Sequence, residues 1–230
     1  LALRGLPNVR ILKRNALTTT IDRQEKSDLG LPVDGYDVIL ANPPFNGRVD
    51  KDRIVDDVKV GTTTATEVLF LKYMMDALKP GGRCGLVVPE GLLFGSTGAH
   101  KEIRRQLVEN NTVEAVLSLP GGVFQPYSNV KTSVLVFKRG GGTERVLFLH
   151  ADADGYKLDA QHDTPIQDDD LPALVGAFKC RGELAQEWEQ RDPKSDWVNK
   201  WWIADVEAIR ANEFNLSAGR YRPMSQAQVE

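Results

Sequence analysis

The stretch Tyr36-Asp-Val-Ile-Leu-Ala-Asn-Pro-Pro-Phe-Asn-Gly47 predicts both the fold class and the site of this protein. Within its first half, Val38–Ala41 are an unbroken apolar run, typical of a strand that is buried on both faces of a parallel sheet. Pro43 and Pro44 lack backbone N–H groups, so the sheet ladder must end there. We therefore expect a rigid turn at the carboxyl end of a sheet strand, where open α/β sheets hold their ligands.

This turn carries groups suited to an amino group on a planar ring. The Asn42 side chain offers a carbonyl acceptor, and the Pro43 carbonyl offers a second acceptor on a stiff backbone. Two fixed acceptors can hold both hydrogens of an NH2 group, while Phe45 offers a flat face for stacking. The predicted catalytic residues are those of the turn, Asn42, Pro43, Pro44 and Phe45. The alternative is an ordinary strand-ending turn with a surface Phe, since Asn-Pro pairs often begin turns.

Apolar runs and helical periodicity elsewhere predict a mostly parallel sheet. Strands are expected at 9–13, 83–89, 112–119, 132–138 and 145–150. Helices are expected at 66–79 and 99–110, and loops at 18–35, 46–66 and 91–98. The alternation of strand and helix implies right-handed crossovers. The 120–131 connection contains no long helix, so the strands on either side of it are expected to be antiparallel neighbours.

The last third of the chain indicates a smaller unit. Three aspartates, 168–170, precede an apolar-periodic run at 171–188, and we interpret them as a helix start and not as a metal cluster. Trp201 and Trp202 lie in a short strand-like stretch. We predict a catalytic part at 1–150 and a helical and strand appendage at 151–230 that contacts another subunit or DNA.

Composition narrows the class of protein. The 230 residues carry 29 basic and 32 acidic side chains, a net charge of −3. A protein that grips a nucleic-acid backbone unaided usually has a basic surplus, so DNA binding here would need a local patch or a partner. Cys84 and Cys180 lie far apart, which is typical of the reducing cytoplasm. No run of about 18 apolar residues predicts a membrane span, and the three histidines share no metal-ligand spacing.

The stretch Asp37–Phe45 resembles motif IV of the S-adenosylmethionine-dependent amino methyltransferases, in the adenine-N6 branch. Further matches resemble the modification subunit of type I restriction-modification systems: Gly85–Phe94, Leu119–Phe124, Thr132–Phe137, and Phe214–Ser217 followed by Tyr221. The resemblance covers nearly the whole chain. It implies an α/β fold: a partial Rossmann-like methyltransferase sheet, mostly parallel with one reversed strand, plus a small C-terminal α+β appendage.

The resemblance also implies a reaction and partners. The intact protein is expected to methylate the N6 amine of adenine in DNA, together with specificity and restriction subunits. The base must leave the duplex first, at a cost of a few kcal/mol. Phe124 would then pack against the base opposite Phe45, with Tyr127 as a second candidate; the alternative is simple packing of the loop. Arg48, Lys51 and Arg53 are expected to contact DNA, against the alternative of a solvated, charge-balanced loop.

The cofactor site departs from the family pattern. The family holds S-adenosylmethionine with a Gly-rich loop after its first strand and an acidic residue after its second, and neither precedes Asn42 here. Asn15 stands where the family contacts the cofactor, although an Asn that only forms a turn is an equal alternative. The chain has no amino-terminal Met, and we expect both strands to lie in an absent amino-terminal part. We therefore predict that this chain alone binds the cofactor weakly or not at all and is inactive.

Two other classes of protein remain open from the sequence. Enzymes that methylate guanine N2 in RNA, or glutamine amides in proteins, use similar Asn-Pro-Pro-aromatic turns. A non-catalytic assembly module that docks a specificity subunit would also suit the Trp-bearing end and the missing cofactor loop. A methylation assay with DNA, RNA and protein substrates separates the enzymes from each other. Substitution of Asn42 by Ala separates the assembly module from an enzyme, because only an enzyme depends on that side chain.

Overall fold

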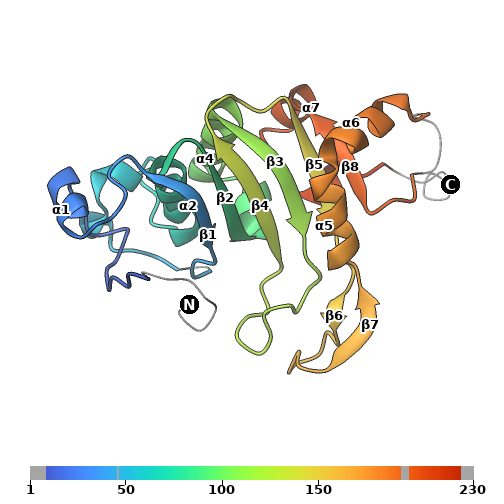
Figure 1. Cartoon of the computed structure of the whole chain (residues 1–230), viewed down its shortest axis with the longest axis horizontal. Helices are drawn as coiled ribbons and strands as arrows, with labels where there is room; N and C mark the ends of the chain where they lie inside the picture. The colour runs from blue at the N-terminus through green and yellow to red at the C-terminus, as the bar shows by residue number, and fades with distance from the viewer. Residues whose placement is uncertain (1–8, 46, 193–196, 224–230) are drawn as a thin grey trace.

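The computed structural model describes residues 9–45, 47–192 and 197–223. Its centre is a six-stranded sheet in the order β1-β2-β4-β3-β5-β8 (Figure 1). The strands of this sheet are β1 (Tyr36–Ala41), β2 (Leu78–Pro89), β3 (Asn111–Ser118), β4 (Thr132–Arg139), β5 (Arg145–His150) and β8 (Trp201–Asp205). The expected strands at 83–89, 112–119, 132–138 and 145–150 are all present, within a residue or two or inside a longer strand.

The directions of the strands confirm the predicted fold class. β1 runs parallel to β2, and β3 runs parallel to β5. β4 lies between β2 and β3 and is antiparallel to both, so it is the expected reversed strand. β8, from the predicted appendage, adds a further antiparallel strand on the outer side of β5. The carboxyl ends of β1, β2, β3 and β5 therefore share one edge of the sheet, which we call the carboxyl edge.

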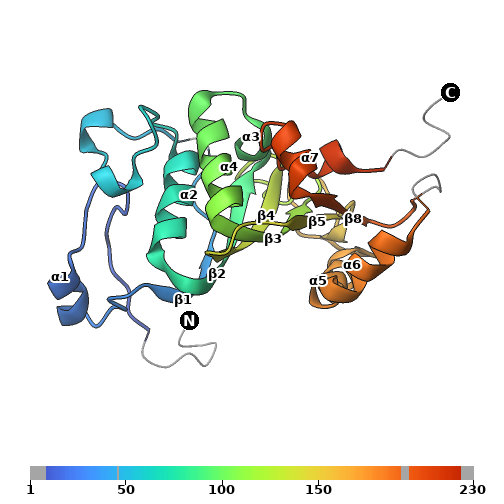
Figure 2. The ribbon, with the colours of Figure 1, turned by 90° about the horizontal axis from the view of Figure 1, so that it is seen from above.

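Helices cover the two faces of the sheet unequally (Figure 2). On one face lie α2 (Thr66–Ala77), α3 (Glu90–Phe94), α4 (Gly98–Asn110) and α7 (Val206–Ala211). The main core lies under them and includes Leu71, Leu86 and Ile103. On the opposite face, α5 (Leu171–Lys179) and α6 (Arg181–Gln190) cover only the β5 and β8 end. The predicted helical run at 171–188 is therefore two helices, which meet at Cys180.

The prediction that β1 is buried on both faces is wrong. Ile39 and Ala41 pack against the main core, but Leu40 is 83% exposed and Val38 is 62% exposed. β1 is an edge strand, and the helices on the face that these two side chains occupy lie at the other end of the sheet. An apolar run does not show whether a strand lies at the centre or at the edge of a sheet, so it does not by itself predict burial on both faces.

The amino-terminal segment also differs from the prediction. Residues 9–13 form no strand, because no described strand lies beside them to accept their backbone hydrogen bonds. The expected loop at 18–35 contains a short helix, α1 (Arg23–Asp28), whose first turn is capped by the Asp22 side chain. Leu17 is buried with Ile54 and Val58, so this segment is held against the region that follows β1.

Three other expected loops and ends are more ordered than predicted. The 46–66 region contains two 3-10 turns, η2 (Lys51–Arg53) and η3 (Asp56–Val58). α3 occupies the start of the expected 91–98 loop. The helix expected at 66–79 ends at Ala77, and β2 begins at the next residue and contains the Pro80-Gly81-Gly82 stretch. Buried apolar side chains, such as Val58 in η3 and Leu92 in α3, hold these segments against the core. A few apolar residues within a polar stretch give no periodic pattern from which this order could be predicted.

The part of the chain after 150 is joined to the sheet. Its β6 (Asp154–Tyr156) and β7 (Pro165–Asp169) form a separate hairpin, whereas β8 pairs with β5. The Trp202 Nε1 donates to the Ala218 carbonyl at the 3-10 turn η4 (Ala218–Tyr221), and the Tyr221 ring stacks on Phe148. The domain boundary near 150 stays a prediction.

Candidate active site

The Asn42–Phe45 turn lies at the carboxyl edge, immediately after β1. The Asn42 side chain is exposed and has no hydrogen-bond partner among the described residues. Pro43 is half-buried and Pro44 is exposed. The two acceptors expected here, the Asn42 amide oxygen and the Pro43 carbonyl, are therefore not consumed by side chains of the described fold. The turn keeps its capacity to hold an amino group.

The turn is fixed on its far side by α2. The Gly47 N–H donates to Thr66 Oγ1 at 3.0 Å, and the Thr66 N–H donates to the Gly47 carbonyl at 3.0 Å. Thr66 is buried at the first position of α2 and lies behind this turn. A Cβ on Gly47 would lie 2.9 Å from the Thr66 side chain, so this approach requires glycine. The helix thus anchors the end of the Asn-Pro-Pro-Phe turn.

Phe45 and Phe124 are in contact. Their ring centroids lie 5.5 Å apart with an angle of 66° between the planes, an edge-to-face pair. Stacked bases repeat about every 3.4 Å, so a base held flat between two rings would separate them by about 7 Å. The structure therefore brings together the two rings predicted to hold a base, but in an arrangement that leaves no base-sized gap between them. The two rings would have to separate for a base to lie between them.

A carboxylate that the sequence prediction missed lies on the same edge. Glu90 follows β2 directly, and its Oε1 accepts from Ser133 Oγ at 2.7 Å and from Ser118 Oγ at 3.4 Å. Its Oε2 accepts from Ser217 Oγ at 3.4 Å. Glu90 thereby links the ends of β2 and β3, the start of β4 and the segment after α7.

A sequence signal for Glu90 did exist. Glu90, Ser133 and Ser217 each lie in a different stretch that resembles the modification subunits, and Ser118 directly precedes a fourth. The four stretches are far apart in the chain, so only the folded structure shows that they meet at one carboxylate. We interpret this cluster as the support of the carboxyl edge behind the turn.

The predicted DNA-contacting residues lie on the segment that follows the turn. Arg48, Lys51 and Arg53 are exposed, and none of them forms an ion pair with a described residue. Arg48 donates to Thr64 Oγ1 at 3.4 Å. Lys59, by contrast, pairs with Asp56 at 2.5 Å. These three exposed cations form no ion pair with a described residue that would compete with a phosphate backbone. Their contact with DNA stays a prediction.

Asn15 is used within its own turn. Its Oδ1 accepts from the Leu17 N–H at 3.1 Å, and its carbonyl accepts from the Thr18 N–H at 3.2 Å. This is the turn-forming alternative that the sequence left open. The side-chain amide of Asn15 is exposed, and a contact from it to a cofactor stays a prediction.

The described residues do not form a complete site for S-adenosylmethionine. The Gly81-Gly82 pair lies inside β2, and Gly140–Gly142 connect β4 to β5, so neither joins a strand to a following helix. On one face of β1, next to the turn, Val38 and Leu40 are exposed. β1 is also at the edge of the sheet, and no described strand pairs with its outer side. A fit to the cofactor is therefore not found in these residues.

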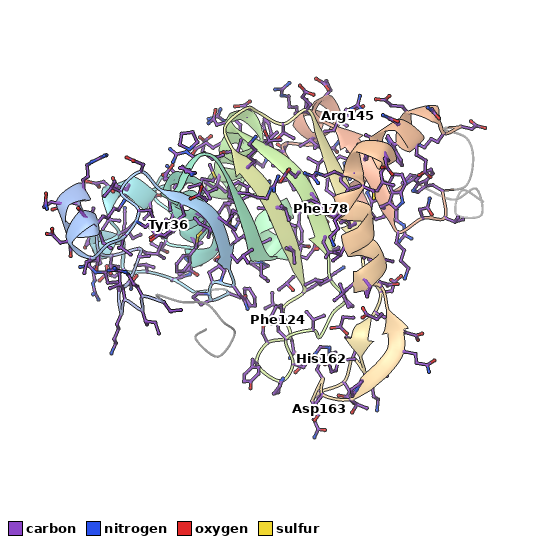
Figure 3. The ribbon with its side chains drawn as sticks, in the orientation of Figure 1. Tyr36, Phe124, Arg145, His162, Asp163 and Phe178 are labelled. Carbon is purple, nitrogen blue, oxygen red and sulfur yellow. The ribbon has the colours of Figure 1, made fainter. Side chains whose placement is uncertain are left out.

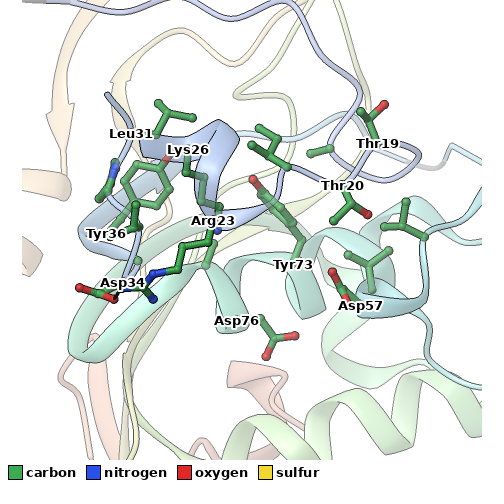
Figure 4. Close-up of a pocket in the computed structure, with 18 of the residues that line it drawn as sticks. Thr19, Thr20, Arg23, Lys26, Leu31, Asp34, Tyr36, Asp57, Tyr73 and Asp76 are labelled. Atoms are coloured by element: carbon green, nitrogen blue, oxygen red, sulfur yellow. Dashed lines mark ion pairs between the residues drawn. The ribbon is translucent and has the colours of Figure 1, made fainter. Parts of the chain in front are cut away.

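A cavity in the amino-terminal half of the chain is lined by residues other than those of the turn (Figure 4). It has a volume of about 840 Å³ and is lined at one end by Tyr36, the first residue of β1, whereas Asn42 follows the last. Two pairs of its charged side chains form ion pairs, Arg23 with Asp34 at 3.1 Å and Lys72 with Asp76. Burial raises the pKa of the Tyr73 hydroxyl in its wall. The cavity does not include the predicted site residues.

Several other chemistries have no support in the described residues. Among them, no group of three His, Cys, Asp or Glu side chains is arranged to hold a metal ion. Cys84 is buried within β2, and burial raises the pKa of its thiol to about 12, which rules it out as a thiolate nucleophile. None of the helices described has the length and apolar content to cross a bilayer.

The chain is similar to known proteins over most of its length. The model of a family described as N-6 DNA Methylase matches residues 1–229. The chain is 32% identical over 182 residues to the EcoEI methylase subunit of a type I restriction enzyme from Escherichia coli. It is 33% identical over 202 residues to the EcoKI methylase subunit from E. coli K12. These matches cover 78% and 84% of this chain but only 35% and 37% of the two relatives.

Solved structures of type I restriction-modification proteins are similar to this chain. A chain from a study of complex assembly and conformational transition of the type I R-M system superposes with a TM-score of 0.69 at 31% identity. That match covers 96% of this chain and 44% of the other. The EcoKI M protein superposes with a TM-score of 0.59 at 22% identity, which covers 82% of this chain and 43% of that protein and indicates a shared fold. The chain thus spans less than half the length of the proteins that it resembles.

Proposed function

The chain belongs to the N-6 DNA methylase family, and from this premise and the free Asn42–Phe45 turn we propose that the intact protein methylates the N6 amine of adenine in DNA. The methyl donor would be S-adenosylmethionine. The observation that carries the proposal is the exposed, unpartnered Asn42 side chain at the carboxyl edge, next to the Phe45–Phe124 pair. Because the chain spans about a third of its curated relatives, the activity is proposed for the whole protein.

The residues of the turn would act by position and charge. The Asn42 Oδ1 and the Pro43 carbonyl accept the two N6 hydrogens and hold the amine in one orientation. As N6 attacks the methyl group, positive charge develops on the nitrogen, and two fixed acceptor dipoles stabilise it. The methyl–sulfur bond of the donor would break as the N6–methyl bond forms, and one amine proton would pass to solvent water, which restores the neutral base. The described turn requires no nucleophilic side chain for this reaction, in agreement with the buried, protonated thiol of Cys84.

Base extrusion gives the aromatic pair its proposed role. Adenine in a duplex cannot reach the turn, so it must rotate out of the stack. Phe45 would then stack on one face of the base and Phe124 on the other, which requires the 5.5 Å ring contact to open. The contact between the two half-buried rings covers part of the apolar surface that the base would contact.

Partners and location follow from the same proposal. The relatives are named as subunits, so we propose that this protein works on DNA with a specificity subunit and a restriction subunit, in the cytoplasm. The net charge of −3 supports a complex in which a partner subunit provides most of the basic side chains that contact the DNA phosphates. Arg48, Lys51 and Arg53 would add a local contact beside the extruded base.

The 230-residue chain alone is proposed to bind S-adenosylmethionine weakly or not at all. The support is the lack of a glycine loop between a strand and a helix in the described residues. Calorimetric titration of this chain with the cofactor should give no saturable heat in the micromolar range. Micromolar binding would contradict the proposal and would direct attention to Asn15 and the exposed edge of β1.

Transfer of a labelled methyl group tests the function. The intact protein, with its specificity subunit, is incubated with labelled S-adenosylmethionine and with DNA, RNA or protein substrates, and the product is digested and identified. N6-methyladenine in DNA is the expected product. N2-methylguanine in RNA or methylglutamine in protein would instead favour the other amino methyltransferases, and the absence of any transfer would favour an assembly module.

A further inference from the structure

The 119–131 loop carries a second aromatic ring in a setting unlike that of Phe124. Tyr127 is 94% exposed, whereas Phe124 is half-buried against Phe45. Figure 1 shows this loop, between β3 and β4, extending beyond the strand ends at the carboxyl edge. Figure 3 shows Phe124 at the same end of the molecule as the β6–β7 hairpin, which carries His162 and Asp163. The loop therefore presents one ring to the site and one to the surroundings.

The two rings belong to one hydrogen-bonded turn. The Gln125 N–H donates to the Gly122 carbonyl at 2.9 Å, and the Tyr127 N–H donates to the Phe124 carbonyl at 2.8 Å. The Ser128 N–H donates to the same Phe124 carbonyl at 2.9 Å. These bonds fix the Tyr127 backbone relative to Phe124. When the loop shifts to open the Phe45–Phe124 contact, Tyr127 must move with it.

We propose that Tyr127 enters the DNA stack beside the target adenine and stabilises the duplex from which that base has been extruded. This inference rests on the proposed function. Extrusion leaves unstacked base faces in the duplex, and aromatic or apolar side chains that enter a base step compensate for such loss. A tyrosine suits this position because its ring stacks on any base and its hydroxyl can hydrogen-bond to water or phosphate. Tyr127 is thus a positioning residue that acts on the duplex, and it does not touch the reacting amine.

The charges around the loop agree with this approach of DNA. Lys131 at the end of the loop is exposed and forms no ion pair with a described residue. Arg48, Lys51 and Arg53 lie after the Phe45 that Phe124 contacts. Exposed cations therefore follow both Phe45 and Tyr127 within four residues along the chain, and Tyr127 is the more exposed ring of the 119–131 loop.

The test compares Tyr127→Ala and Tyr127→Phe in the intact protein with its specificity subunit. One duplex carries a normal A·T pair at the target, and a second carries the target adenine opposite an abasic site, where extrusion costs less. Tyr127→Ala should lower kcat/KM on the paired duplex by about tenfold or more, in line with the loss of one stacking contact. It should leave the second duplex within about threefold of wild type, a range expected from the same loss when no pair must be broken. Tyr127→Phe keeps the ring and should restore most of the rate on the paired duplex.

A spectroscopic readout separates this role from a merely structural one. With 2-aminopurine in place of the target adenine, wild type should raise the fluorescence on binding, and Tyr127→Ala should lose most of that rise on the paired duplex only. Tyr156→Ala is the matched control, because Tyr156 is also exposed and lies on the β6–β7 hairpin. It should behave as wild type.

The experiment distinguishes failure of the Tyr127 proposal from failure of the proposed methylation activity. If wild type methylates neither duplex, the proposed function is wrong. If wild type methylates both, and Tyr127→Ala equals wild type on the paired duplex or loses the same factor on both, the role of Tyr127 in extrusion is refuted. An equal loss in Tyr156→Ala would likewise refute it, because the effect would then follow from removal of any exposed ring.

Discussion

At the scale of single residues, Glu90 is the side chain on which the carboxyl edge depends. It accepts from three serine hydroxyls, the shortest at 2.7 Å from Ser133. Replacement by Ala removes a charged acceptor and leaves those hydroxyls without it, so we predict a loss of about 2 kcal/mol in the free energy of unfolding. Urea unfolding of the chain measures it. Glu207→Ala, at an exposed position on α7, should stay within about 0.5 kcal/mol of wild type.

Glu67 gives a prediction about pH. Interaction with His100, whose Nε2 lies 3.6 Å from Glu67 Oε1, lowers the pKa of Glu67 below 4.5. A carboxyl group whose pKa is lowered by folding stabilises the fold above its unfolded pKa, and this stabilisation is lost as pH falls through the folded value. Glu67→Gln should therefore be less stable than wild type at pH 7, and the difference should shrink below pH 4.5. Unfolding curves at several pH values decide it, and a difference that grows on acidification would contradict the assignment.

The sequence predicted some residues of the site and missed others for a physical reason. Asn42 to Phe45 form a local turn, so their spacing in the chain already describes their arrangement. The Phe45–Phe124 contact joins residues far apart, and the family resemblance indicated it as a base-holding pair. Glu90 was missed because its partners come from distant segments, and the resemblance of each separate stretch does not show that they meet at one carboxylate.

At the scale of elements, α4 is tied to the rest of the fold through a buried guanidinium. Arg104 is 2% exposed, and it donates to the Phe214, Leu92 and Gly95 carbonyls at 2.9–3.0 Å. Burial lowers the pKa of Arg104, but an arginine remains charged at neutral pH. One side chain thus satisfies carbonyls of α3 and of the segment after α7.

Replacement of Arg104 by Met keeps much of its volume and removes its donors. Three inward-facing carbonyls then lose their partner, so we predict a loss of about 3 kcal/mol in the free energy of unfolding. Arg105→Met is the control, because Arg105 lies on the same helix but is exposed. It should change stability little. Equal effects of the two substitutions in chemical denaturation would show that the guanidinium has no special role in the fold.

The elements also show where sequence patterns reach their limit. The helices and central strands were predictable because periodicity and apolar runs reflect packing against one core. The exposure of Leu40 and the absence of a strand at 9–13 were not predictable, because both depend on which neighbour lies beside a segment. The antiparallel β3–β4 pair was predictable from the short 120–131 connection, whereas the β2–β4 pair joins strands that do not follow each other in the chain.

At the scale of the whole molecule, the predicted boundary near 150 can be tested by truncation. A chain that ends at His150 lacks β8 and α5 to α7 and exposes Phe148 and Leu149, which are buried in the full chain. It should lose cooperative thermal unfolding, followed by circular dichroism. A sharp transition close to that of the full chain would instead favour an independent unit before 150.

The account as a whole claims that the Asn42–Phe45 turn holds the amine that accepts a methyl group. The most direct test is methyl transfer to DNA by the intact protein and its specificity subunit, with Asn42→Ala compared with Asn199→Ala at an exposed position elsewhere. Asn42→Ala should lower the rate of N6-methyladenine formation by about a hundredfold or more, the loss typical when an aligned polar group is removed from a transition state, with DNA binding retained. Asn199→Ala should match wild type. Methylation by Asn42→Ala at the wild-type rate would contradict the central claim.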